Sequence, residues 1–181
     1  MISIVAFNFC EDNEHTAKVL TERWFQTEDI GCKDAHDFLQ IIGRKTDFIS
    51  FDGKTVCVTK IETLMRLLPL IGDVCIIGKE TTNLIALISL NVEYLQQIAK
   101  EKLVNLNDVI FAPPTAAAIK SHINRINLQL PPIEAIKNYS ILPDAFSVES
   151  NEITPTRNIK RYHVIHLHSG TIDQLLKTQV K

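Results

Sequence analysis

The sequence predicts an α+β fold, in which small mixed sheets are flanked by helices and preceded by a β-rich segment. Apolar stretches occur in pairs separated by glycine turns, which is typical of hairpins. Between these pairs lie segments whose apolar residues recur at helical spacing. The 181 residues, 45% hydrophobic and 22% charged, suffice for one ordinary globular domain, or for a small domain and part of another.

The first 43 residues are expected to be mostly strand. Residues 2–9 form an apolar strand, and a helix follows from the acidic residues 11–14 to Leu20, where carboxylates suit the positive end of the helix dipole. Residues 24–31 and 37–42 alternate like the two arms of a hairpin. The polar segment 43–47 then predicts a domain boundary.

From residue 48 onward the pattern predicts further hairpins and helices. Strand 48–51 meets strand 54–58 through the turn at Asp52-Gly53, and Thr59 is expected to cap the next helix. The remaining expected elements are a hairpin of strands 73–77 and 84–90, helices at 92–102 and 115–128, a strand through 139–142 and a last helix at 171–178.

Charge and hydropathy exclude several classes of protein. A net charge of −2 and a pI near 6.3 give no electrostatic footprint for nucleic acid. The longest apolar runs, 67–71 and 84–90, are far shorter than the roughly 20 residues that span a bilayer, and residues 1–7 lack the features of a signal peptide. The four cysteines show no Cys-x-x-Cys spacing, so we interpret them as reduced, mostly structural thiols of a cytoplasmic protein.

Near the carboxyl end, residues 152–161 read Glu-Ile-Thr-Pro-Thr-Arg-Asn-Ile-Lys-Arg. Proline cannot continue a helix, so this polar segment predicts an exposed loop followed by two cations, Lys160 and Arg161. Further on, His166 and His168 are expected on one face of a strand with His163 nearby. No cysteine or acidic partner lies nearby in sequence, so surface histidines are favoured over a metal site, and we assign no metal.

Three segments, in order, resemble the adenylate-forming acyl-CoA synthetases, closest to the long-chain and bubblegum type. Residues 24–31, Trp-Phe-Gln-Thr-Glu-Asp-Ile-Gly, are similar to the family's Trp-[Phe/Leu]-x-Thr-Gly-Asp-Ile-Gly. Residues 38–47 resemble Phe-Leu-x-Ile-x-Gly-Arg-x-Lys-Asp, and Gly53 to Val56 with Ile61-Glu62 follow at family spacing. Residues 142–161 resemble the end of the long-chain members.

The resemblance implies a domain division. Residues 1–43 would be the tail of a large amino-terminal AMP-binding domain, 44–47 a hinge and 48–181 the mobile carboxyl-terminal lid. The family's phosphate loop, adenine-binding segment and magnesium-binding glutamate lie upstream of the residues that match here. ATP or AMP, coenzyme A and Mg²⁺ are therefore expected for the full-length family, and none is assigned with certainty to this chain.

The resemblance also assigns roles to single residues. Asp29 matches the aspartate that binds the ATP ribose, and Arg44 the arginine that reaches ribose and phosphate. Thr46 stands at the hinge position, and Gly53 in the loop that lines the pantetheine tunnel. Glu28 replaces a family glycine and should crowd and repel a nucleotide.

The sharpest departure lies in the loop at 154–161. Relatives read Thr-Pro-Thr-x-Lys-x-Lys-Arg, and their first lysine stabilises charge during adenylation. Here Asn158 stands at that position, so an electrostatic contribution on the order of 2.7–4 kcal/mol would be lost. Arg157 or Lys160 as a replacement cation is the open alternative.

Two functional hypotheses follow. The first is the carboxyl-terminal part of a long-chain fatty acid–CoA ligase, incomplete or inactive alone, acting on fatty acid, ATP and coenzyme A. The second is a non-catalytic remnant that binds nucleotide or coenzyme A weakly, or a protein partner. Self-association through residues 1–43 and peripheral contact with intracellular membranes are part of these expectations.

Overall fold

The computed structural model describes residues 20–21, 24–25, 27, 29–51, 53–79 and 83–177. The chain divides into two compact units, Met1–Phe48 and Ile49–Lys181. The strand expected at residues 2–9 and most of the helix that should follow it lie outside the described residues. Leu20, the expected end of that helix, instead begins a strand.

The first unit contains two short antiparallel pairs. Strand β1 (Leu20–Thr21) pairs with β2 (Trp24–Phe25), and β3 (Asp29–Lys33) pairs with β4 (Leu39–Arg44). The predicted hairpin is therefore confirmed, but its first arm begins at Asp29 and not at Trp24. In its turn, Asp34 Oδ1 accepts backbone N–H bonds from His36 at 2.8 Å and Phe38 at 3.0 Å, which closes the loop. A single 3₁₀ turn, η1 (Lys45–Asp47), follows.

The second hairpin joins β5 (Phe48–Phe51) to β6 (Lys54–Cys57). Gly53 has φ +69°, a left-handed conformation that favours glycine, as the turn prediction requires. Helix α2 (Val58–Met65) begins one residue before Thr59, so Thr59 does not cap it. Starting at Val58 places the apolar residues Val58, Ile61 and Met65 on one buried face, and this packing outweighs the capping preference.

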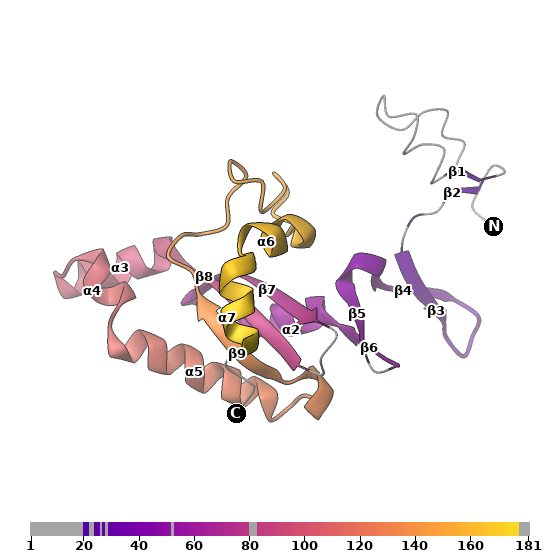
Figure 1. Cartoon of the computed structure of the whole chain (residues 1–181), viewed down its shortest axis with the longest axis horizontal. Coiled ribbons are helices and arrows are strands. Elements are labelled where there is room, and N and C mark those ends of the chain that lie inside the picture. The colour runs from indigo at the N-terminus through magenta and orange to yellow at the C-terminus, as the bar shows by residue number, and fades with distance from the viewer. Residues whose placement is uncertain are drawn as a thin grey trace. The chain divides into compact units, whose positions relative to one another are not determined.

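The second unit is built on a three-stranded sheet (Figure 1). Strand β7 (Ile71–Lys79) pairs antiparallel with β8 (Asn83–Leu90), which pairs in parallel with β9 (Ile136–Ile141). Alternate residues of β8 enter two separate cores: Leu84, Ala86 and Ile88 pack on one face, and Ile85 and Leu87 on the other. A strand buried on both faces needs the continuous apolar run seen in the sequence.

Helices cover both faces of this sheet. The first core contains residues of α2, α3 (Val92–Lys102), the short α4 (Leu106–Ile110) and α5 (Pro113–Asn127), with η2 (Pro132–Glu134) leading into β9. The second core contains residues of α6 (Arg161–Leu167) and α7 (Ser169–Lys177). Figure 1 shows α7, in yellow, lying across the sheet on the side away from α2. These mixed sheets and helices confirm the α+β class.

The strand expected through the histidines is wrong, because His163 and His166 lie in helix α6 and His168 follows its end. A short alternating run cannot distinguish strand from helix. The helix is favoured because it brings Val164, fully buried, into the second core beside Ile172 of α7. We expected neither α4 nor α6.

Candidate functional site

The loop at residues 153–160 is a closed turn at the surface. Ile153 and Ile159 form an isolated antiparallel bridge, and the Thr154 N–H donates to the Asn158 carbonyl at 2.8 Å. Arg157 has φ +60° and its N–H donates to the Thr154 carbonyl at 2.8 Å. Residues 155–158 are exposed, which confirms the predicted loop.

Asn158, which we predict to stand at the family's lysine position, hydrogen-bonds within its own loop. Its backbone N–H donates to Thr154 Oγ1 at 3.0 Å, and its side-chain Nδ2 donates to Thr156 Oγ1 at 3.1 Å. Thr156 Oγ1 in turn lies 2.9 Å from Thr154 Oγ1. The amide of residue 158 therefore stabilises the turn, a role that needs no charge.

Arg157 is turned towards the sheet. Its Nη2 lies 2.8 Å from Asp73 Oδ2, at the start of β7. The carboxylate is nearly buried, with 8% of its side chain exposed, whereas 71% of the arginine side chain is exposed. The pair lies on the wall of a pocket of about 340 Å³ that also touches Ser89, Asn91 and Glu93.

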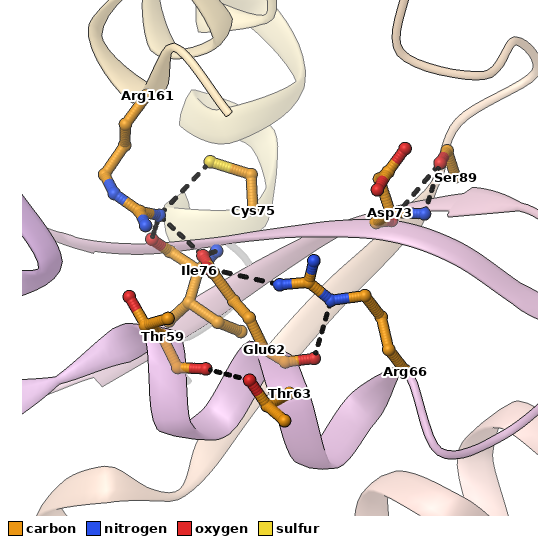
Figure 2. A network of polar contacts seen from close by, with 9 residues as sticks. All are labelled: Thr59, Glu62, Thr63, Arg66, Asp73, Cys75, Ile76, Ser89 and Arg161. Atoms are coloured by element: carbon orange, nitrogen blue, oxygen red, sulfur yellow. Dashed lines mark hydrogen bonds and ion pairs between the residues drawn. The ribbon is translucent and has the colours of Figure 1, made fainter. Parts of the chain in front are cut away.

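The two cations after the turn have different surroundings. Lys160 Nζ donates to Asn151 Oδ1 at the surface, as expected for a loop cation. Arg161 does not stay exposed: its Nη1 lies 2.7 Å from Glu62 Oε1 and 2.6 Å from the Ile76 carbonyl, and only 16% of its side chain is exposed (Figure 2). The sequence carried no signal for this pairing, since Glu62 is 99 residues away.

Glu62 and Arg161 together bond the backbone N–H and carbonyl of Ile76, on the outer edge of β7. The Ile76 N–H donates to Glu62 Oε1 at 2.8 Å while the Ile76 carbonyl accepts from Arg161 (Figure 2). An edge strand presents such unpaired groups to other chains, and here a carboxylate and a guanidinium occupy them. Glu62 therefore has a structural role in this geometry.

Cys75 adjoins this ion pair, with its Sγ 3.4 Å from Arg161 Nη1. Burial raises the pKa of the Cys75 thiol to about 12, although the charge of Arg161 acts in the opposite direction. A thiol of that pKa stays protonated and unreactive at neutral pH. Cys32 and Cys57 are also free thiols, and Cys10 lies outside the described residues.

The base of the loop is held by Glu152. Its Oε1 lies 2.7 Å from His168 Nε2, and its Oε2 accepts bonds from the Ser147 N–H and the Ser150 hydroxyl. Desolvation raises the pKa of this carboxyl, but the bonds from Ser150, His168 and Ser147 outweigh it and hold the pKa below its usual value.

In the first unit, the two predicted nucleotide-binding residues lie side by side. Asp29 and Arg44 face each other at the start of β3 and the end of β4, and Arg44 Nε is 3.5 Å from Asp29 Oδ1. The Arg44 N–H donates to Asp47 Oδ2 at 3.1 Å, across the 3₁₀ turn that contains the predicted hinge residue Thr46. Glu28 lies outside the described residues.

Gly53, the predicted tunnel-loop residue, is at the tip of its hairpin in the second unit. A Cβ added there would meet no heavy atom within 4 Å, so its φ, and not crowding, accounts for the glycine. Among the described residues, no group of three His, Cys, Asp or Glu side chains could hold a metal ion. No helix in that part of the chain is long and apolar enough to cross a bilayer.

Comparison with known proteins agrees with the resemblance in the sequence. No family model matches the chain. The Mycobacterium tuberculosis long-chain-fatty-acid–CoA ligase FadD15 is 29% identical over 177 residues, which are 95% of this chain and 30% of that protein. The rat long-chain-fatty-acid–CoA ligase ACSBG2 is 28% identical over 194 residues, 94% of this chain and 29% of the relative.

These homologues of the chain are long-chain fatty-acid–CoA ligases. The match lies in their carboxyl-terminal region, and the chain spans about 30% of the length of FadD15. Among solved structures, the adenylation domain of a Mycobacterium chelonae carboxylate reductase has a TM-score of 0.72 at 20% identity, over 91% of this chain and 25% of that one. The adenylation domain from Segniliparus rugosus gives 0.71 at 18% identity, over 93% and 26%. These structures establish the shared fold.

The homology leaves the individual site residues as predictions. The structure brings Asp29 and Arg44 together in one unit and places Asn158, Arg157 and Lys160 on one loop of the other. The Glu62–Arg161 pair and Asp73 were not predicted from the sequence.

Proposed function

We propose that these 181 residues are the carboxyl-terminal portion of a long-chain fatty acid–CoA ligase. We propose further that they are inactive without the large amino-terminal AMP-binding domain, called the body below. The observation that carries this proposal is a match over 95% of the chain to only 30% of FadD15. In this proposal residues 1–43 belong to the large domain, residues 44–47 form the hinge and residues 48–181 form the lid.

The exposed apolar surface of the hairpin β3–β4 supports the proposal that the amino-terminal body covers it. Large apolar side chains stand out from it into solvent: Phe38 is 71% exposed, Leu39 69% and Ile41 57%. A two-stranded hairpin is at best marginally stable in water. Covering these side chains would remove apolar surface from water at about 25 cal/mol per Å².

The described residues suit part of the expected chemistry. The Asp29 carboxylate can accept both hydroxyls of a ribose, and the Arg44 guanidinium can donate to phosphate oxygens. ATP would supply the adenylyl group and coenzyme A the thiol. Mg²⁺ would be held by the upstream glutamate of the family, and we assign no residue of this chain to it.

The state of Asn158 favours the second candidate function, a non-catalytic remnant with weak nucleotide or coenzyme A binding. Its amide is neutral and is bonded to Thr156. Without a cation at this position, adenylation would proceed slowly even beside a complete body.

The decisive experiment combines the chain with the amino-terminal body of FadD15 and measures adenylate formation from fatty acid and ATP. We expect none from the chain alone and slow formation in the mixture. The variant Asn158→Lys should raise the rate in the mixture about 10²–10³-fold. Asn107→Lys, an exposed asparagine on α4, is the matched control.

The outcomes separate the two candidates. Adenylate formation by the chain alone would contradict the claim that it is incomplete. No gain with Asn158→Lys, together with measurable binding of AMP or coenzyme A by calorimetry, would favour the remnant.

We also propose that the exposed hairpin makes the chain self-associate, or contact membrane surfaces peripherally, in a cytoplasmic setting when no body covers it. Sedimentation should show association that falls when Phe38 and Ile41 are both replaced by serine. Replacing the exposed Leu103 and Phe111 of the second unit is the control, since their exposure is similar at 93% and 78%.

A further inference from the structure

The tip of the 153–160 turn is tied to the sheet through Arg157. Its partner Asp73 precedes it by 84 residues, so the contact is made by the fold and not by the local sequence. The base of the same turn is held separately, by the Lys160 N–H donating to the Glu152 carbonyl at 2.8 Å and by Arg161 on Glu62.

The backbone of Asp73 is bonded to the neighbouring strand. Its backbone N–H donates to Ser89 Oγ at 2.9 Å, and Ser89 Oγ lies 3.2 Å from the Asp73 carbonyl, so both strands fix its position (Figure 2). The residue as a whole is 5% exposed. A guanidinium that meets this carboxylate therefore takes a defined place.

Arg157 reaches that place through an unfavourable backbone conformation. Its φ of +60° lies in the left-handed region, where a side chain other than that of glycine, asparagine or aspartate is disfavoured. The ion pair, with 71% of the arginine side chain exposed, can offset only part of that penalty. The left-handed residue also sets the direction of the chain into Asn158, whose N–H and side chain then bond back to Thr154 and Thr156.

We propose that Asp73 is a positioning residue, which holds Arg157 and thereby orients residue 158. The inference rests on the proposed function, in which this loop faces the reacting groups. It also answers the question left open by the sequence. With its guanidinium on Asp73, Arg157 serves as the anchor of the loop and not as the replacement for the family's lysine.

The test measures local opening of the loop in the full 181-residue chain. Trypsin cleaves after Arg157 only when the turn opens, and under native conditions the rate follows the open population. We expect Asp73→Asn to raise cleavage at this bond about fivefold, the factor for an ion pair at the upper end of the surface range. The ¹⁵N heteronuclear NOE of Asn158 should fall in the same variant.

Two variants make the result specific. Glu93→Gln removes another carboxylate that lines the same pocket, and it should leave both measurements unchanged. Asp73→Glu keeps the charge and should restore part of the protection. Added salt should raise cleavage in the native chain more than in Asp73→Asn, because only the native chain has the pair to screen.

The proposal is overturned if Asp73→Asn leaves cleavage and NOE unchanged, or changes them no more than Glu93→Gln does. It is also overturned if hydrogen exchange of the β8 amides in Asp73→Asn shows a loss of stability as large as the one that the cleavage rate reports for the loop. Asp73 would then only support the fold. None of these measurements depends on ligase activity, so failure of the proposed function would leave the result readable.

Discussion

Strands β4 and β8 both carry large aliphatic side chains, but the environments of these side chains are opposite. In β4, Leu39, Ile41 and Ile42 are between 50% and 69% exposed, whereas in β8 Ile85, Leu87 and Ile88 are fully buried. The difference lies in the layers around each strand. Strand β8 has a neighbour on each side and helices over both faces, while β4 pairs with β3 alone among the described residues.

This contrast shows that an apolar strand pattern predicts that the strand is buried, but does not predict which element covers it. Full burial of a leucine or isoleucine is worth about 1.5–3 kcal/mol. In the second unit the chain supplies the covering helices itself. In the first unit, none of the described residues covers the apolar side chains of β4. This supports the proposal that the amino-terminal body covers them.

The largest expected effect comes from breaking the ion pair at the edge of the buried sheet. Glu62→Gln leaves Arg161, only 16% exposed, without its carboxylate, and should lower the free energy of unfolding of the second unit by about 3–5 kcal/mol. Hydrogen exchange of the β8 amides measures this. Lys60→Gln, two residues before Glu62 in the same helix and 61% exposed, should change it by less than about 0.5 kcal/mol. A small effect of Glu62→Gln would show that the other contacts of Arg161, the Ile76 carbonyl among them, suffice to hold its side chain.

A matched pair of truncations tests the contrast between the strands directly. Leu87→Ala should cost about 2–5 kcal/mol, because it opens a cavity in the second core. Ile41→Ala should cost less than about 0.5 kcal/mol, because the side chain is already 57% exposed. Urea unfolding, followed by tertiary probes in each unit, measures both. Equal costs would contradict the contrast, and a large cost for Ile41→Ala that appears only beside the FadD15 body would sharpen it.

The smallest expected effect is the response of the loop base to acid. Since hydrogen bonds hold the pKa of Glu152 below its usual 4.5, the unfolded chain takes up this proton first as pH falls. The carboxylate therefore contributes stability that is fully present above pH 4.5 and is lost as pH drops through the lower folded pKa. Glu152→Gln should flatten the acid side of the stability curve, measured by urea unfolding between pH 3 and 7. An unchanged slope would show that the bonds to Ser150 and His168 do not depend on the charge.

Much of the fold could be predicted because its signals are local. The turn at Gly53 and the continuous apolar run of β8 each depend on neighbouring residues. The errors arose where tertiary packing overrode a local preference. Thr59 is a good capping residue, yet α2 begins at Val58 because the buried face requires it. The histidines alternate like a strand, yet Val164 must enter the core from a helix.

The candidate site divides in the same way. The sequence by itself determined the resemblance to the acyl-CoA synthetases and the predicted roles of five residues, because these follow from residue identity and spacing; they are Asp29, Arg44, Thr46, Gly53 and Asn158. Only the tertiary structure decided that Arg161 is buried on Glu62 and that Arg157 is anchored on Asp73. Those partners are 99 and 84 residues apart in the chain. Which charges pair over such separations depends on the tertiary fold, because only folding brings the two side chains together.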